Sequence, residues 1–132
     1  MDTAVHPLKI FIVENHEDTL TYLRRYLEQQ GHEVLCAKDM RTAIEALKSL
    51  SIDVLISDIG LPDGDGWELM RTLSKSRPAP FGIAMSGFGT RSDSEKSRAA
   101  GYRHHLNKPF LPEDIDTMLE EAAKERFLSP QA

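Results

Sequence analysis

The segment "KIFIVENHED", from Lys9 to Asp18, begins as a continuous apolar run and ends in a cluster of polar and acidic residues. A strand whose successive residues are all apolar is buried on both faces, as in a parallel sheet that helices cover on each side. Further apolar runs occur at residues 34–37, 54–56 and 81–85 and, more weakly, around Leu106. We therefore predict five strands, and the first of them carries Glu14 and Asn15 at its carboxyl end.

Four segments between and after these runs have apolar residues spaced three or four positions apart, which indicates amphipathic helices. They contain Leu20, Leu23 and Leu27; Ala43, Ile44, Leu47 and Leu50; Leu69, Met70 and Leu73; and Ile115, Met118, Leu119 and Ala122. A fifth helix is expected over "RSDSEKSRAAG", residues 91–101, which offers little apolar surface and should be weakly anchored. Strands that alternate with helices predict an α/β fold with a parallel sheet and right-handed crossovers.

The length and composition are those of one ordinary globular domain. We expect a single domain over residues 1–132, with a core from about residue 8 to residue 124 and short tails that include "SPQA" at the end. The net charge of -5 argues against direct nucleic-acid binding. No apolar stretch approaches the roughly 20 residues that span a bilayer, and Cys36 is the only cysteine. These features predict a cytoplasmic protein without membrane insertion.

The polar residues that follow the strands point to one site. In a sheet of this kind, functional groups gather at the carboxyl ends of the strands. These ends carry Glu14 and Asn15, Asp58, Ser86 and Lys108. The set suits phosphoryl transfer to a carboxylate, in which Asp58 is the nucleophile and Mg²⁺ and the ammonium group neutralise charge on the phosphoryl oxygens. The Ser86 hydroxyl would donate a hydrogen bond to another of these oxygens.

Four motifs, "IVEN", "SDIGLPDGDGWEL", "MSG" and "NKPF", occur in the order and at about the spacing found in response-regulator receiver domains. The chain resembles this family, the phosphoacceptor module of two-component signalling, from Leu8 to about Lys124. The resemblance implies a doubly wound, flavodoxin-like sheet with strand order 2-1-3-4-5. It also implies a histidine kinase or histidine phosphotransferase as partner, a downstream effector protein and a weak homodimer.

The resemblance assigns a role to each polar residue. It implies phosphorylation of Asp58, and Mg²⁺ held by Glu14, Asn15, Asp58 and the backbone carbonyl of Gly60. The implied phosphoryl contacts are Ser86, Gly87 and Lys108, and the implied switch residues are Ser86 and His105. The same resemblance predicts no separate substrate turnover, so we do not expect an enzyme.

Asn15 departs from the family pattern, because an aspartate that touches the metal is typical at this position. An amide oxygen can bind Mg²⁺ but brings no charge, so we expect the loss of one carboxylate to cost on the order of 1–2 kcal/mol, or roughly ten- to thirtyfold in affinity. Glu14, which is one methylene longer than aspartate, could compensate by reaching inward. The competing hypothesis is a phosphorylation-independent interaction module.

Two further classes of protein are weaker alternatives. A phosphatase with an aspartyl-phosphate intermediate usually has a second acid two residues after the nucleophile, where Gly60 stands in this chain. A flavin-binding electron carrier shares the expected fold, but no phosphate-binding Ser/Thr loop follows the first strand. Outside the site, Trp67 and Met70 are expected to be packing residues.

Overall fold

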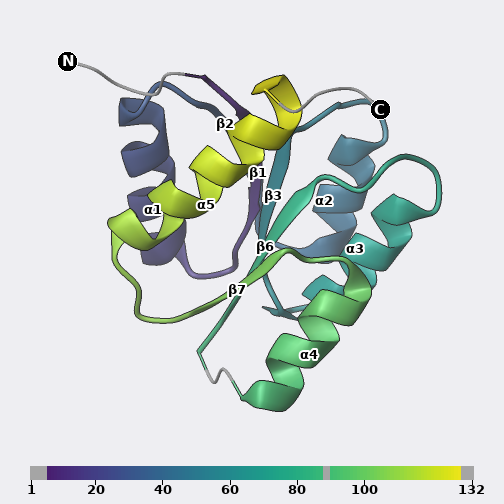
Figure 1. Cartoon of the computed structure of the whole chain (residues 1–132). Helices are drawn as coiled ribbons and strands as arrows, with labels where there is room; N and C mark the ends of the chain where they lie inside the picture. The colour runs from purple at the N-terminus through teal and green to yellow at the C-terminus, as the bar shows by residue number, and fades with distance from the viewer. Residues whose placement is uncertain (1–5, 88–89, 129–132) are drawn as a thin grey trace.

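The computed structural model describes residues 6–87 and 90–128, and its centre is a five-stranded parallel sheet (Figure 1). The strands are β1 (Lys9–Val13), β2 (Glu33–Ala37), β3 (Val54–Asp58), β6 (Phe81–Ser86) and β7 (His104–Asn107). Their order is β2-β1-β3-β6-β7, and every neighbouring pair is parallel. This order confirms the predicted doubly wound topology. The expected tails, including "SPQA" at 129–132, lie outside the described residues.

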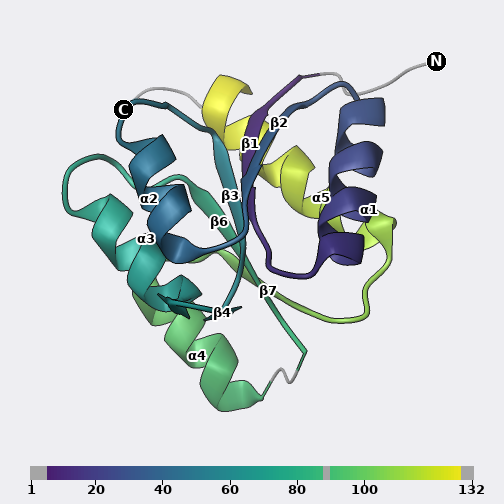
Figure 2. The same cartoon turned by 180° about the vertical axis from the view of Figure 1, so that it is seen from behind.

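Helices cover both faces of the sheet. They are α1 (Glu17–Gln29), α2 (Met40–Leu47), α3 (Gly66–Ser74), α4 (Arg91–Ala100) and α5 (Pro112–Ala123), which continues into a short π-helix, η1 (Lys124–Leu128). The helices α1 and α5 lie on one face, and α2, α3 and α4 lie on the other (Figures 1 and 2). The second helix ends earlier than its apolar stripe predicted, because Leu50 lies beyond it. None of the helices formed by residues 6–87 and 90–128 is long and apolar enough to cross a membrane.

The continuous apolar run of β1 is explained by two separate cores. Ile10 and Ile12 pack with the apolar faces of α1 and α5, whereas Phe11 and Val13 pack with those of α2 and α3. Successive side chains of a strand point to opposite faces, so both sets must be apolar when helices cover both faces. The helix α4 contributes a single buried apolar side chain, Ala100, to its core, since its other buried residue is Ser97.

The loop after β3 folds back onto the end of that strand. It contains a small antiparallel pair, β4 (Gly60–Leu61) and β5 (Gly64–Asp65). At Gly66, the next residue, a Cβ atom would lie 2.6 Å from the backbone oxygen of Asp58. Only glycine permits this close approach, which holds the loop beside the carboxyl end of β3.

Candidate functional site

Three charged side chains from distant parts of the sequence meet at the carboxyl edge of the sheet. Glu14 follows β1, Asp58 ends β3, and Lys108 follows β7. The Lys108 Nζ atom lies 2.8 Å from Glu14 Oε1 and 2.9 Å from Asp58 Oδ2. The structure therefore brings together the two acids and the ammonium group that the sequence placed at strand ends.

Strand register explains why these groups meet. Asp58 is paired with Met85, so Ser86 lies one residue beyond it on the neighbouring strand. Ser86 is in turn paired with Asn107, and the Lys108 backbone N–H donates to the Ser86 carbonyl over 2.8 Å. Each side chain is thus fixed by the sheet itself and not by a mobile loop.

The charges at this edge are largely buried and do not balance. Glu14 is fully buried, Asp58 is nearly so, and the side chain of Lys108 is 19% exposed. Burial acts to raise the pKa of Glu14, but hydrogen bonds from Lys108 and His16 outweigh it and lower this pKa. Burial likewise acts to lower the pKa of Lys108, and the two acids outweigh it and raise this pKa. One ammonium is therefore shared by two acids. The cluster keeps a net negative charge, which a second cation would neutralise.

His16 is a contact that the sequence did not indicate. Its backbone N–H donates to Glu14 Oε2 over 2.9 Å, and its ring Nδ1 lies 3.0 Å from the same oxygen. Together with Lys108, this engages both Glu14 oxygens. Asn15 lies between these residues in the chain and is exposed. The spacing is the one signal for this contact, since an acid can accept the backbone N–H of the residue two positions later, as short polar side chains do in turns.

The donor atoms at this edge fit a hard divalent cation. Glu14, His16 and Asp58 each offer a ligand atom, and these atoms lie within 4.8 Å of one another. The carboxylate oxygens are of the type that Mg²⁺ prefers, and the exposed Asn15 amide would supply a neutral oxygen. Gly60 is exposed beside them, and its N–H donates to Asp58 Oδ1 over 3.2 Å.

The predicted switch residues are in direct contact. Ser86 Oγ lies 2.8 Å from His105 Nε2, and the other ring nitrogen of His105 lies 2.8 Å from Ser97 Oγ. Trp67, which we expected only to pack, also donates its indole N–H to Ser97 Oγ over 2.9 Å. Burial lowers the pKa of His105, against a smaller opposing effect of Asp93. Ser97 could not be recognised from the sequence, because one serine in a polar helix looks like a surface residue.

Gly87, the remaining predicted phosphoryl contact, is exposed at the end of β6. A Cβ atom added there would meet no atom of the described residues within 4 Å. On this side of Gly87 the residues that the structure describes leave space for an incoming group.

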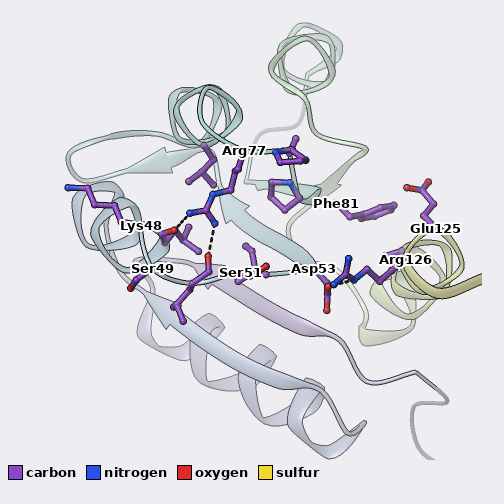
Figure 3. A pocket seen from close by; sticks show the side chains of 16 residues that line it. Lys48, Ser49, Ser51, Asp53, Arg77, Phe81, Glu125 and Arg126 are labelled. Atoms are coloured by element: carbon purple, nitrogen blue, oxygen red, sulfur yellow. Dashed lines mark hydrogen bonds and ion pairs between the residues drawn. The ribbon is translucent and has the colours of Figure 1, made fainter. Parts of the chain in front are cut away.

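A cavity of about 620 Å³ lies at the opposite, amino edge of the sheet (Figure 3). Its charged side chains bind the protein itself. Arg77 donates to the backbone oxygens of Leu47 and Leu50, and Arg126 forms an ion pair of 2.8 Å with Asp53. These contacts hold chain segments together, so the carboxyl edge is the better candidate for the functional site.

Comparison with known proteins identifies the family of this chain. The family model described as "Response regulator receiver domain" matches residues 10–120. An uncharacterized 14.6 kDa protein of Leptolyngbya boryana is 28% identical, over 86% of this chain and 88% of its own length. The KDP operon transcriptional regulatory protein KdpE of Escherichia coli is 31% identical over 87% of this chain. The virulence sensor protein BvgS of Bordetella bronchiseptica is 30% identical over 95% of this chain. The chain spans 51% of KdpE and 11% of BvgS.

Solved structures show the same fold. A CheY-like response regulator receiver domain protein from Methanospirillum hungatei has a TM-score of 0.85 and 28% identity, covering 91% of this chain and 96% of its own. The beryllofluoride-activated NtrC4 receiver domain dimer has a TM-score of 0.83 and 27% identity, covering 89% of this chain and 97% of its own. The chain therefore belongs to the response-regulator receiver domain family of two-component systems.

Proposed function

We propose that this receiver domain accepts a phosphoryl group on Asp58 from a phosphohistidine of a histidine kinase or a histidine phosphotransferase. The observation that carries the proposal is the Asp58 carboxylate, which lies 2.9 Å from the Lys108 ammonium at the carboxyl edge of the sheet. In the transfer, an Asp58 oxygen forms a bond to phosphorus while the bond from phosphorus to the donor's imidazole nitrogen breaks. The electron pair of the broken bond stays on that nitrogen, and the product is an acyl phosphate.

The residues around Asp58 have the roles that such a transfer needs. Lys108 supplies fixed positive charge, and the Ser86 hydroxyl donates to a phosphoryl oxygen beside the open space at Gly87. Glu14 and Asp58, with the Asn15 amide and the Gly60 carbonyl, would hold Mg²⁺, which when bound neutralises charge on the phosphoryl oxygens. Because Lys108 and His16 already engage both Glu14 oxygens, we expect this cation to bind more weakly than at a site with a second acid.

Phosphorylation would act by shifting a two-state equilibrium rather than by turning over a separate substrate. The elements concerned are α4, β7 and α5, because Ser86 contacts His105 on β7 and α4 is held by little buried surface. Weakly held elements are those that switches use. The surface formed by α4, β7 and α5 would then bind an effector protein, or a second copy of the chain in a weak dimer; the beryllofluoride-activated NtrC4 receiver domain is a dimer. The phosphoryl exchange would take place in the cytoplasm.

A phosphorylation-independent interaction module is the second candidate. One observation favours it: Lys108 and His16 already contact the Glu14 carboxylate, and the next residue, Asn15, is an amide without charge. A protein of this kind would keep the fold and the contact surface without Mg²⁺ and without an adduct at Asp58.

Incubation with acetyl phosphate, with and without Mg²⁺, tests the proposal when the product is read by intact mass. We expect a Mg²⁺-dependent phosphoryl adduct in the wild type that is absent from Asp58→Asn. Asp53→Asn is the matched control, since Asp53 precedes the same strand at the opposite edge and contacts Arg126. It should keep the adduct. Absence of any adduct in the wild type over a wide range of Mg²⁺ concentration would favour the interaction module.

A further inference from the structure

Four side chains form a continuous row of hydrogen bonds from the carboxyl edge of the sheet to α3. Ser86 contacts His105, His105 contacts Ser97, and Ser97 contacts Trp67, with distances of 2.8, 2.8 and 2.9 Å. Both serines are buried, and Ser97 is only 1% exposed. The row thus joins the hydroxyl beside Asp58 to two helices on one face of the sheet.

The direction of these hydrogen bonds follows from what each group can do. The indole of Trp67 can only donate, so Ser97 Oγ accepts from it. The Ser97 hydroxyl still has its own proton, and among residues 6–87 and 90–128 its remaining partner is His105 Nδ1. If Ser97 donates to Nδ1, then a neutral His105 carries its proton on Nε2 and donates to Ser86 Oγ.

The opposite tautomer of His105 would reverse the hydrogen bond to Ser86 and leave the Ser97 hydroxyl without an acceptor in the part of the chain that the structure describes. With the proton on Nδ1, the unprotonated Nε2 of His105 would accept the Ser86 hydroxyl proton, and the Ser97 proton would have no acceptor among the described residues. A buried donor without a partner costs about 1–3 kcal/mol. The Ser97 proton therefore favours the Nε2–H tautomer, and the hydrogen bond from Trp67 holds Ser97 Oγ in the position from which it donates.

We propose that Ser97 and Trp67 are positioning residues that hold His105 in its Nε2–H tautomer, so that the Ser86 hydroxyl proton stays free for a phosphoryl oxygen. The first half of this inference concerns the protein without a phosphoryl group, and the second half rests on the proposed function. Neither Ser97 nor Trp67 would touch the reacting atoms. Their effect reaches Ser86 only through His105.

Two further observations support a positioning role over simple packing. Ser97 and Ala100 are the buried residues of α4, and an alanine at position 97 would fill the same face without a polar group to satisfy. Burial also lowers the pKa of His105, which keeps the ring neutral at pH 7, where a tautomer is defined.

The tautomer can be measured directly by two-bond ¹H–¹⁵N correlation NMR of the unphosphorylated, Mg²⁺-free protein. We expect His105 to carry its proton on Nε2 in the wild type and in Ser97→Thr, which keeps the hydroxyl. Ser97→Ala should shift the ring toward the Nδ1–H form, and Trp67→Phe should do so partially. Ser94→Ala is the control, because Ser94 is exposed one turn earlier in α4. An Nδ1–H wild type, or an unchanged ring in Ser97→Ala, would overturn the inference.

Beryllofluoride with Mg²⁺, as a phosphoryl analogue, tests the second half. Ser97→Ala should weaken its binding by roughly three- to tenfold, the factor expected for one impaired hydrogen bond to a charged group. Ser97→Thr and Ser94→Ala should bind as the wild type does. Equal binding by Ser97→Ala would overturn the link to Ser86. A wild type that binds no beryllofluoride would instead contradict the proposed function, and the NMR result would still decide the positioning role.

Discussion

At the amino edge of the sheet two cationic side chains have partners of their own: Arg126 binds Asp53, and Arg77 binds two backbone oxygens (Figure 3). At the carboxyl edge one ammonium, that of Lys108, is shared by two buried acids. The contacts at the amino edge hold chain segments together. The cluster at the carboxyl edge has an excess of negative charge and open space beside it. A cavity of about 620 Å³ lies at the amino edge, where Arg77 and Arg126 bind the protein itself. Unbalanced, convergent charge is therefore a better guide to the candidate site than a cavity.

The two edges should differ most in how much stability the protein loses when one cationic side chain is removed from each. Lys108→Met leaves two buried carboxylates without their ammonium, and we expect the free energy of unfolding at pH 7 to fall by about 3 kcal/mol. Arg126→Met removes a guanidinium that is 60% exposed and should cost less than about 1 kcal/mol. Urea denaturation measures both. Added Mg²⁺ should stabilise Lys108→Met more than it stabilises the wild type. Equal losses of stability in Lys108→Met and Arg126→Met would contradict the difference between the edges.

Arg77 tests whether the amino edge is structural. In Arg77→Met the last turn of α2 loses a charged donor to the Leu47 and Leu50 oxygens, and we expect a loss of about 2 kcal/mol in the free energy of unfolding. The phosphoryl adduct at Asp58 should form as before in the folded fraction. Arg71→Met is the control, because Arg71 is exposed on α3 and should change stability little. A loss of the adduct in folded Arg77→Met would mean that the two edges are coupled.

Substitution of Asn15 tests how much the missing carboxylate lowers the Mg²⁺ affinity of the carboxyl edge. Asn15→Asp adds a carboxylate beside Glu14, and we expect Mg²⁺ affinity to rise by roughly ten- to thirtyfold, or on the order of 1–2 kcal/mol. Gln29→Glu adds the same charge at the far end of α1 and should leave the affinity unchanged. Calorimetric titration with Mg²⁺ measures both. Saturation of the wild type at ordinary Mg²⁺ concentrations would show that Asn15 weakens nothing.

The features that the sequence predicted are those that depend on repeating patterns. Continuous apolar runs between helical stripes gave the sheet, and the rule for parallel strand ends then brought Asp58 and Lys108 together. The contacts of His16 and Ser97 depend on the directions of single side chains, which no periodicity encodes. The small β4 and β5 pair was missed for a related reason, since two residues are too few to show a strand pattern.

The two edges should also differ in their response to acid. At the amino edge, the Leu8 backbone N–H donates to Nδ1 of His32 over 3.0 Å, so that nitrogen must be unprotonated. Burial lowers the pKa of His32, against a smaller opposing effect of Asp116. A lowered histidine pKa stabilises the fold fully above the ordinary value of 6.5, and this contribution is lost as the pH falls below it. At the carboxyl edge the pKa of Glu14 is lowered, so its contribution is lost only below the ordinary value of 4.5.

Between about pH 7.5 and about pH 5.5 the amino edge should therefore weaken while the Glu14 contacts persist. His32→Asn tests this, because an asparagine oxygen can accept the Leu8 N–H at any pH in this range. We expect the variant to lose less stability than the wild type over the interval, with a difference of up to about 1 kcal/mol, the worth of one hydrogen bond. His105 also has a lowered pKa and contributes in the same interval, but it is unchanged in the variant and cancels in the comparison. Parallel stability curves for the two proteins would show that His32 does not set the acid response of the amino edge.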